Sequence, residues 1–315
     1  MMTRSECAEF LRRQDNFCIL THDAPDGDTL GSAATLCRGL RAMGKTAFVL
    51  KNAETPDHLA YLCDGLTVDE PMEGATVVSV DVPSAHMLLK HPSVNADMIQ
   101  LRIDHHGKST SFTPLELVDP QSASCAELIY DILVELGVEI TAEIAIPLYT
   151  GLSTDTGCFR FANTNAHTYA TAAVCAASGA NLQPITQALF DTVSLSRLRV
   201  QAWVTENTRF LAGGKAAICA MPLGLAQQLG VKEEEVGGMS GFIRSIEGVC
   251  LAATLREDSE AGKIFISVRA VPGYDAAAVC EKFGGGGHKG AGGGSTTLSL
   301  AEATQKMTEA LLEQM

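Results

Sequence analysis

Long apolar runs, paired cysteines and an excess of basic residues are all missing from this 315-residue sequence. No apolar run reaches the ~18 residues that a membrane-spanning helix needs, and residues 1–13 carry scattered charges where a secretory signal would have an apolar core. The ten cysteines include no CxxC pair, and several lie in apolar stretches such as NFCIL and AAVCAA. These absences predict a cytoplasmic protein without membrane contact, whose cysteines are reduced and mostly buried.

Basic charge is scarce as well, because the formal net charge is −14 and the pI is about 5.0. A protein that grips long duplex DNA usually carries a basic stripe that neutralises many phosphates, and the sequence has none. Any nucleic acid that this chain binds is therefore expected to be short and single-stranded, or a small nucleotide, held by a few well-placed cations.

Short apolar runs alternate with helical patterns through the first half of the chain. Strand-like runs cover residues 16–22, 46–50, 75–81 and 98–104, and helical patterns cover 3–14, 29–43, 84–89, 122–136, 141–152 and 166–178. This alternation is typical of an α/β fold with a doubly wound, mainly parallel sheet, in which ligands bind beyond the carboxyl ends of the strands.

A smaller α/β domain is expected to follow, because NLQP breaks the helical pattern and 315 residues are ample for two cores. Strand-like runs recur at 216–220, 249–255 and 264–270, a loop is predicted at GGGGHKGAGGG, and a last helix begins near Leu300. We predict a first domain over residues 1–182, a linker over 183–200, a second domain over 201–315, and a cleft between the two domains.

Four groups of acidic and histidine residues fall where the first domain's strands or helices end. They are HDAPDGD at 22–28, the aspartate of VVSVD at 81, DHH at 104–106 and the aspartate of the STDTG turn at 155. Carboxylates gathered at strand ends repel one another and resist burial unless cations bind them. Aspartate oxygens mixed with imidazole nitrogens suit manganese better than calcium, with magnesium, zinc, cobalt or iron as alternatives. Two such ions about 3.5–4 Å apart can activate a water and polarise a phosphoryl oxygen.

The segments HDAPDGDTLGS, VVSVDVPS, DHH and STDTGCFRF resemble the four successive motifs of the DHH phosphoesterases, and GGGGHKGAGG resembles the signature of the substrate-binding domain that accompanies them. The resemblance covers essentially the whole chain. VSLSRLR at 193–199 and RSIEGV at 244–249 resemble the branch of bacterial short-RNA exonucleases that also dephosphorylate 3′-phosphoadenosine 5′-phosphate. The signature departs from the family where Lys289-Gly290-Ala291-Gly292 replaces the usual ending.

The resemblance implies a role for each residue of the four groups. His22 and Asp26 would bind one metal, Asp28, His105 and Asp155 the other, and Asp81 would bridge the two. Asp104 would accept a hydrogen bond that orients a neighbour, and His106 would face the scissile phosphate.

The second domain is expected to bind the terminal nucleotide. The backbone N–H groups of the glycine run can approach an anion closely because no Cβ intervenes, and an arginine can fork onto a phosphate. The candidate residues are Ser267, Arg269, Gly286, Gly287, His288, Arg244 and Arg197. Arg160 is expected to support the Asp155 turn.

The sequence predicts an enzyme that hydrolyses short oligoribonucleotides to 5′-mononucleotides, 3′-phosphoadenosine 5′-phosphate to AMP, or both. Two alternatives stay open: a phosphodiesterase for cyclic dinucleotides or linear pApA, and a nucleotide-binding regulator without catalysis. A long single-strand exonuclease of the RecJ type and a pyrophosphatase are disfavoured. The polarity of degradation and the oligomeric state, a homodimer included, are not fixed by the sequence.

Overall fold

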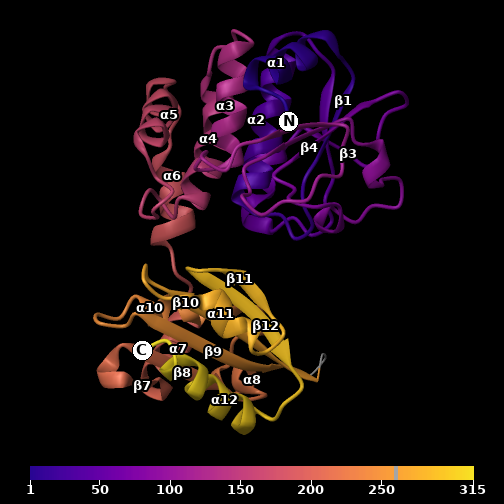
Figure 1. The fold of residues 1–315 in the computed structure, drawn as a ribbon. Helices are drawn as coiled ribbons and strands as arrows, with labels where there is room; N and C mark the ends of the chain where they lie inside the picture. The colour runs from indigo at the N-terminus through magenta and orange to yellow at the C-terminus, as the bar shows by residue number, and fades with distance from the viewer. Residues whose placement is uncertain (259–261) are drawn as a thin grey trace. The chain divides into compact units, whose positions relative to one another are not determined.

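The computed structural model describes residues 1–258 and 262–315. The chain divides into two units, Met1–Thr192 and Val193–Met315, each with its own sheet (Figure 1). The predicted linker at 183–200 contains the short helix α6 (Gln183–Thr186), a single π-helical turn (Gln187–Asp191) and the start of α7 (Leu195–Asn207). The two units are described separately below.

The first unit contains a six-stranded, all-parallel sheet in the order β3-β2-β1-β4-β5-β6. Its strands are β1 (Phe17–Leu20), β2 (Ala47–Leu50), β3 (Thr67–Val68), β4 (Thr76–Val80), β5 (Leu101–Asp104) and β6 (Leu115–Val118). The chain fills the sheet outward from β1 through β2 to β3, then returns to β4 on the other side of β1. The order therefore reverses between β1 and β4, the place where open parallel sheets bind ligands.

Helices α1 to α5 of this unit lie together in Figure 1, and α2, α3 and α4 pack against one another. Their bounds are α1 (Arg4–Arg13), α2 (Gly27–Ala42), α3 (Cys125–Glu135), α4 (Ala142–Asp155) and α5 (Ala166–Ala177). The Thr3–Glu6 capping box starts α1, and Gly44, with φ of 79°, lies just beyond the end of α2. The α/β fold class predicted from the sequence is confirmed.

Two local predictions for the first unit were wrong. The helix expected at 84–89 is only one 3₁₀ turn, Ala85–Met87, because Leu88 and Leu89 are buried against β1 residues Cys18 and Leu20 in an extended segment. Asp155 was placed in a turn after a helix, but it is the last residue of α4.

Helices α2 and α4 approach so closely that glycine is needed on both. A Cβ at Gly31 would lie 2.6 Å from the Pro147 carbonyl oxygen, and a Cβ at Gly151 would lie 2.7 Å from the Ala126 Cβ. The same Cβ at Gly151 would lie 2.9 Å from Oδ1 of Asp28. The contact between these helices therefore fixes where the Asp28 carboxylate lies.

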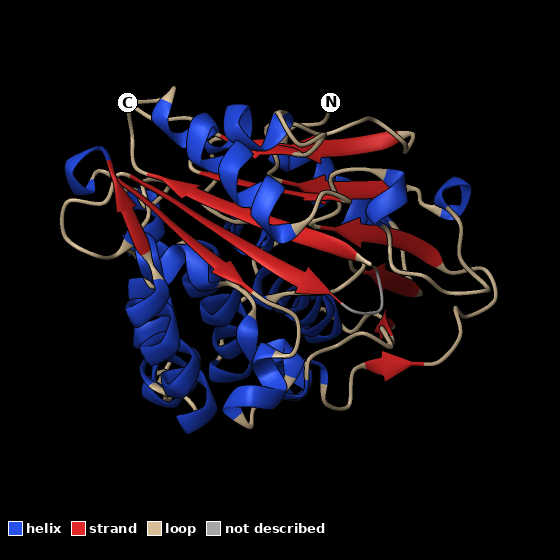
Figure 2. Cartoon of the chain, turned by 90° about the horizontal axis from the view of Figure 1, so that it is seen from below, coloured by secondary structure: helices blue, strands red, loops and turns tan. Residues whose placement is uncertain are grey.

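The second unit contains a mixed six-stranded sheet in the order β11-β12-β10-β9-β8-β7, in which β8 and β9 are parallel and the other described neighbours are antiparallel. Its strands are β7 (Arg209–Leu211), β8 (Ala216–Met221), β9 (Leu251–Asp258), β10 (Lys263–Ala270), β11 (Gly286–His288) and β12 (Ala291–Thr296). Both faces of the sheet are covered, because alternate residues of β8 enter different apolar clusters. Figure 2 draws the strands of both units in red and the helices in blue.

Helices α11 (Ala276–Glu281) and α12 (Leu300–Leu312) pack on one face of this sheet. Helices α7, α8 (Leu225–Leu229), α9 (Glu233–Val236) and α10 (Met239–Arg244) cover the other. The Ser299–Glu302 capping box starts α12 where the sequence predicted the last helix.

The glycine run was predicted to be a loop, and that prediction was wrong. Residues 286–296 form the antiparallel pair of β11 and β12. Glycine is needed at Gly292 because a Cβ there would lie 2.6 Å from the Ala276 carbonyl oxygen on α11. The run is glycine-rich partly because a helix packs directly on the backbone of the strands, a use of glycine that resembles a loop in sequence.

All ten cysteines are free, and eight of them are buried, as the sequence predicted. Among the described residues, no helix is both long and apolar enough to cross a membrane.

Candidate metal centre

The predicted ligands converge at the carboxyl ends of the strands, next to the point where the strand order reverses. His22 follows β1, Asp81 follows β4, and His105 follows β5, so neighbouring parallel strands deliver all three to one edge. Asp28 lies in the first turn of α2, which begins after the β1 loop, and Asp155 ends α4, which packs along α2. The order of the parallel strands therefore explains why His22, Asp28, Asp81 and His105 lie close together, whereas the position of Asp155 depends on the packing of α4.

One group of ligand atoms consists of His22, Asp26 and Asp81. The Nε2 atom of His22 lies 3.6 Å from Oδ1 of Asp26 and 3.8 Å from Oδ2 of Asp81. Asp26 is also the N-cap of α2, since its Oδ1 accepts hydrogen bonds from the N–H groups of Asp28 and Thr29. The helix start therefore holds this carboxylate in place.

A second group consists of Asp28, His105 and Asp155, with Asp81 beside it. The Nε2 atom of His105 lies 3.7 Å from Oδ2 of Asp28, 3.6 Å from Oδ1 of Asp81 and 3.6 Å from Oδ2 of Asp155. One imidazole nitrogen thus faces three carboxylates from three different elements.

These separations distinguish a cation site from a hydrogen-bond network. Distances of 3.6–3.8 Å are too long for hydrogen bonds. Two ligand atoms that each lie about 2.0–2.2 Å from one ion, at angles near 90–110°, are separated by roughly 3–3.6 Å. The spacing suits two cations, one in each group, after small adjustments.

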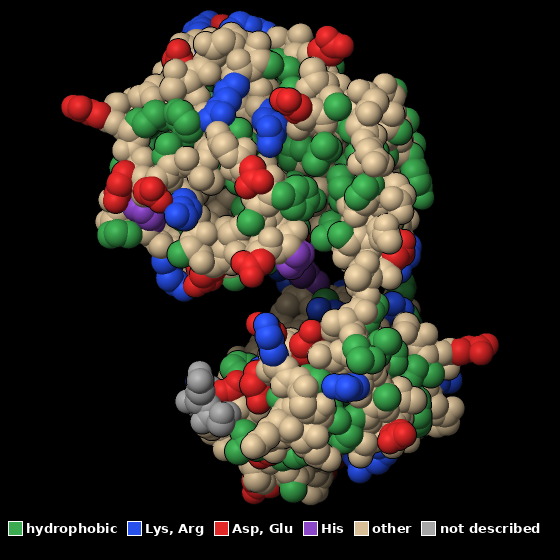
Figure 3. Space-filling view, turned by 180° about the vertical axis from the view of Figure 1, so that it is seen from behind, with side chains coloured by type: hydrophobic (Ala, Val, Ile, Leu, Met, Phe, Trp, Pro, Cys, Tyr) green, Lys and Arg blue, Asp and Glu red, His purple; other side chains and the backbone are tan. Residues whose placement is uncertain are grey.

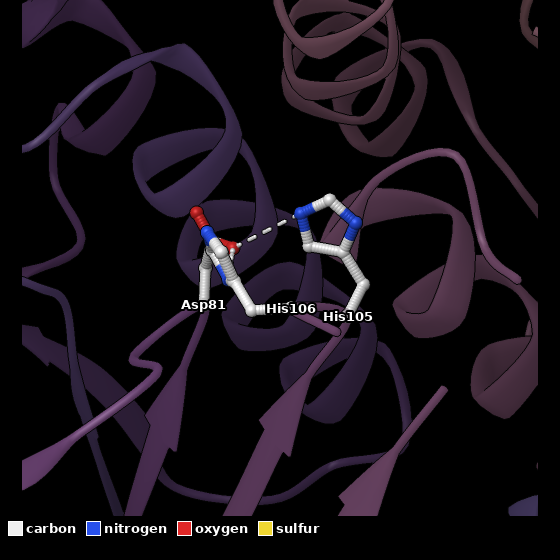
Figure 4. Close-up of side chains that lie close together, drawn as sticks. All are labelled: Asp81, His105 and His106. Atoms are coloured by element: carbon white, nitrogen blue, oxygen red, sulfur yellow. Dashed lines mark ion pairs between the residues drawn. The ribbon is translucent and has the colours of Figure 1, made fainter. Parts of the chain in front are cut away.

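Asp81 faces both groups with different oxygens. Its Oδ1 is directed toward His105 and its Oδ2 toward His22, and Figure 4 shows the Asp81 and His105 side chains pointing toward each other. The Oδ1 atom is buried and has no hydrogen-bond partner, which is costly for a carboxylate oxygen. Asp81 adopts a left-handed backbone with φ of 60°, so strain is retained where the side chain must point into the site. This is the geometry that a bridging ligand requires.

The electrostatics of the site also favour bound cations. Burial raises the pKa of Asp28 and Asp81 well above the usual range, and the neighbouring carboxylates raise it further. Burial likewise raises the pKa of Asp155. The four neighbouring carboxylates of Asp26, Asp28, Asp81 and Asp155 are stable together as anions only beside positive charge, so the residues present fit a pair of divalent metals.

Asp28 has a structural role in addition. Its Oδ2 accepts the Cys125 N–H at 2.7 Å and its Oδ1 accepts the Ala126 N–H at 3.0 Å, both at the N-terminus of α3. A negative charge at a helix N-terminus is favourable because it pairs with the free N–H groups there.

Hydrogen bonds fix the orientation of the His22 and His105 imidazoles. The Nδ1 atom of His22 lies 2.6 Å from the Asp23 carbonyl oxygen, and the Nδ1 atom of His105 lies 3.3 Å from the Ser122 carbonyl oxygen. A carbonyl only accepts, so in each ring Nδ1 carries the proton and Nε2 keeps the lone pair that a metal needs.

Asp104 and His106 form a separate pair beside these ligands. Oδ1 of Asp104 accepts hydrogen bonds from Nδ1 of His106 at 2.8 Å and from the His106 backbone N–H at 3.2 Å. The Asp104 side chain is fully buried, whereas His106 is about one-third exposed. Asp104 therefore orients His106 and leaves its Nε2 free to meet a substrate.

Sequence reasoning overlooked Arg102. It is the largest fully buried side chain of the described chain and lies in β5, two residues before Asp104. An arginine inside an otherwise apolar strand was the available signal, since arginine is almost never fully buried unless it is paired.

In the second unit, strand register brings three substrate candidates onto one face. Arg269 of β10 and His288 of β11 are both paired with Ala291 of β12, and Ser267 lies two residues before Arg269. Paired residues and residues two apart point to the same face. Gly293, on that same face, is paired with Ser267 and with Gly286, so this part of the face has few side-chain atoms. Gly286 and Gly287 both lie in β11.

The remaining two arginines differ in their availability. Nη1 of Arg197 donates to the Glu235 and Gly237 carbonyls, which commits it to holding the loop before α10. Arg244 is half-buried in the last turn of α10. Both arginines stay candidates for the substrate site. Arg160 donates to the Gly157 carbonyl, beside the Asp155 helix end, as expected.

Comparison with known proteins agrees with this geometry. The family model described as "DHH family, N-terminal domain" matches residues 16–152, and the "DHHA1 domain" model matches residues 213–315. A protein from Thermus thermophilus named bifunctional oligoribonuclease and PAP phosphatase NrnA is 36% identical over 94% of this chain and 89% of its own length. The chain belongs to the DHH family of phosphoesterases. The family and the phosphoester hydrolysis predicted from the four motifs are confirmed.

Solved structures share the fold. An exopolyphosphatase-related protein from Bacteroides fragilis matches with a TM-score of 0.86 at 25% identity, over 98% of this chain and 95% of that one. RecJ from Thermus thermophilus, solved in complex with Mn²⁺, matches with a TM-score of 0.56 at 16% identity, over 99% of this chain and 55% of that one. The second likeness concerns the fold alone.

Proposed function

We propose that this DHH phosphoesterase is a two-metal enzyme that hydrolyses short oligoribonucleotides to 5′-mononucleotides and 3′-phosphoadenosine 5′-phosphate to AMP. The observation that carries the proposal is the pair of ligand groups joined by Asp81, in a chain whose close relative bears both activities in its name. Six side chains from distant stretches lie close together, an arrangement that a nucleotide-binding regulator would not need.

The metal assignment extends the same reasoning. His22 and Asp26 would hold one ion, Asp28, His105 and Asp155 the other, and Asp81 both. We propose Mn²⁺ because the donors are aspartate oxygens and imidazole nitrogens. When bound, the ions supply a water of lowered pKa and positive charge beside the phosphoryl oxygens.

The chain's own residues then complete the reaction. Hydrolysis forms a bond from the water oxygen to phosphorus, breaks the bond to the leaving ester oxygen and requires a proton on that oxygen. His106 can provide that proton from Nε2 when both of its ring nitrogens are protonated, a cation that the Asp104 carboxylate at Nδ1 stabilises. Asp104 contacts no other described ligand group by hydrogen bond and acts through His106.

Substrate would be bound by the face that carries Ser267, Arg269 and His288. The guanidinium of Arg269 suits a phosphate, and Gly286 and Gly287 allow close approach of an anion to backbone N–H groups. On the surface drawn in Figure 3, acidic and basic side chains are interspersed, without a continuous basic stripe among the described residues in view. Such a surface favours short substrates over long nucleic acid. The cytoplasmic location stays a prediction.

The rival function within this class is hydrolysis of linear pApA or cyclic dinucleotides. A panel of pApA, cyclic di-AMP, 5′-phosphorylated RNA of two to five residues and 3′-phosphoadenosine 5′-phosphate, each with Mn²⁺, decides between them. We expect turnover of the short RNAs and of 3′-phosphoadenosine 5′-phosphate. Turnover of pApA or cyclic di-AMP without turnover of the other short RNAs and of 3′-phosphoadenosine 5′-phosphate would establish the rival, and no Mn²⁺-dependent turnover of any substrate would point to a regulator.

The bridging role of Asp81 has its own test. Asp81→Ala should fold, bind fewer than two Mn²⁺ ions and lose nearly all turnover. Substantial activity of the pure variant in Mn²⁺ would contradict the assignment.

A further inference from the structure

Arg102 is a buried arginine that makes polar contacts close to the DHH segment, residues 104–106. It is 1% exposed and occupies β5 between β4 and β6, in register with Ser79 and Glu116. Because residues two apart on a strand point to the same face, its side chain lies on the face that carries Asp104.

The contacts of Arg102 join three segments. Nη1 donates to the carbonyl oxygens of Pro83 at 3.1 Å and Thr110 at 3.0 Å, and Nη2 contacts Oε2 of Glu116 at 3.4 Å. The guanidinium also lies over the Phe112 ring at 5.1 Å. Pro83 is two residues after the bridging Asp81, and Thr110 is four residues after His106, so one side chain ties both site loops to the sheet.

Asp104 lies between this arginine and His106. Its Oδ1 holds the imidazole, while its Oδ2 is buried without a hydrogen-bond partner and lies 3.9 Å from Nη1 of Arg102. A fully buried carboxylate needs a compensating positive charge or hydrogen bonds on both oxygens. The Arg102 guanidinium, which stays charged at all relevant pH values, supplies that positive charge on the Oδ2 side and keeps the Asp104 carboxylate turned toward His106.

We propose that Arg102 is a positioning residue, which acts through Asp104 to aim Nε2 of His106 at the leaving oxygen of the phosphoester. The proposal rests on the proposed function, because it assumes that His106 protonates that oxygen. As the bond from phosphorus to the leaving oxygen breaks, the electron pair stays on that oxygen and the His106 proton joins it. Positioning of this proton matters only when the leaving group needs one.

The leaving group therefore provides the test. Hydrolysis of a dinucleotide releases a nucleoside alkoxide, which needs a proton. Hydrolysis of a p-nitrophenyl ester of a nucleoside 5′-phosphate releases p-nitrophenolate, which is stable without one. For Arg102→Met, kcat on the dinucleotide should fall by about 10²-fold, the low end of general-acid effects, with KM little changed. On the nitrophenyl ester kcat should fall by less than about 3-fold. Equal losses on the two substrates would mean general damage to the site and would overturn the proposal, as would no loss on either.

A double-variant cycle with His106→Ala provides a second readout that a structural role would not give. If Arg102 acts through His106, Arg102→Met should cause little further loss of dinucleotide turnover in a His106→Ala background, because the two effects are not additive. Full additivity overturns the proposal. Glu116→Gln is the matched control, since it removes the other charged partner of Arg102 while Asp104 keeps its arginine, and its leaving-group selectivity should equal that of the wild type.

Two further variants serve as controls for loss of folding. Arg102→Met combined with Glu116→Gln removes both charges of the buried pair, and Arg102→Lys keeps the charge but loses the fork. Arg102→Lys should recover at least about 5-fold of the lost dinucleotide turnover. If the methionine variants do not fold, the leaving-group comparison is made on Arg102→Lys, and equal losses there reject the proposal. Absence of wild-type turnover on both substrates would instead defeat the proposed function.

Discussion

Gly151→Ala should damage the metal centre although residue 151 bears no side chain in the wild type. The added Cβ would lie 2.7 Å from the Ala126 Cβ and 2.9 Å from Oδ1 of Asp28. Because carbon atoms are in favourable contact at about 3.5–4.0 Å, α4 must move away from the start of α3 by about 1 Å. The added Cβ also presses against the Asp28 carboxylate, which accepts hydrogen bonds from the Cys125 and Ala126 N–H groups. The substitution therefore displaces Asp28, a predicted metal ligand, directly.

The cost can be estimated from two opposing effects. Overpacking of this kind typically costs about 1–3 kcal/mol, whereas replacing glycine by alanine in a helix stabilises it by about 1 kcal/mol. Gly241 of α10 has nothing within 4 Å of its added Cβ and provides the matched control, which should show only the gain. The two variants should therefore differ in free energy of unfolding by about 1–3 kcal/mol.

Calorimetric titration with Mn²⁺ and urea unfolding measure the two consequences. We expect Mn²⁺ affinity to fall by about 10–100-fold in Gly151→Ala, as when the support of a ligand is lost, and to stay at the wild-type value in Gly241→Ala. Wild-type Mn²⁺ affinity in Gly151→Ala would show that Asp28 is not held by this helix contact, and would refute the reasoning.

Three further predictions concern charge and metal. In the metal-free protein, the raised pKa values of Asp28 and Asp81 mean that the fold is most stable below about pH 4, where both carboxyls are protonated in the folded and the unfolded chain alike, and that stability is lost as pH rises from there through the folded-state pKa values. Metal-free Asp81→Asn should therefore be more stable than metal-free wild type at pH 7.5, with a gap that narrows at pH 5; a constant gap in urea unfolding would contradict this. Arg269→Ala should raise KM for dinucleotides by at least about 10-fold without changing Mn²⁺ binding, and an unchanged KM would remove Arg269 from the substrate site. Removal of metal with EDTA should abolish turnover and added Mn²⁺ should restore it, whereas activity that survives full chelation would exclude metal-dependent hydrolysis.

The sequence predicted the first unit well because its signals are local. Buried strands such as β1 and β4 are short apolar runs, and the capping residue Thr3 starts a helix where its pattern begins. The order of the parallel strands is not local, but an alternating pattern leaves few arrangements. The ligands at strand ends were therefore predictable as a group before any distance was known.

What the sequence did not reveal depends on packing between distant segments. The glycine run forms paired strands because α11 lies against Gly292, and no property of the run itself distinguishes that use from a flexible loop. Arg102 has a role only because β4, β6 and the DHH segment converge around it. The commitment of Arg197 to carbonyls near residue 236 likewise follows from tertiary structure.

Stability and activity are coupled in this site through the same carboxylates. Asp26 caps α2 and Asp28 accepts hydrogen bonds from the first two N–H groups of α3, so two predicted ligands also stabilise helix starts. The helix starts hold these anions in place, yet the anions repel one another and Asp81, whose buried oxygen has no partner among the described residues. The fold therefore maintains a concentration of negative charge that divalent cations relieve, and binding of those cations contributes free energy to folding. For this reason a substitution that weakens the helix contacts should be detected first as weaker metal binding and only then as unfolding.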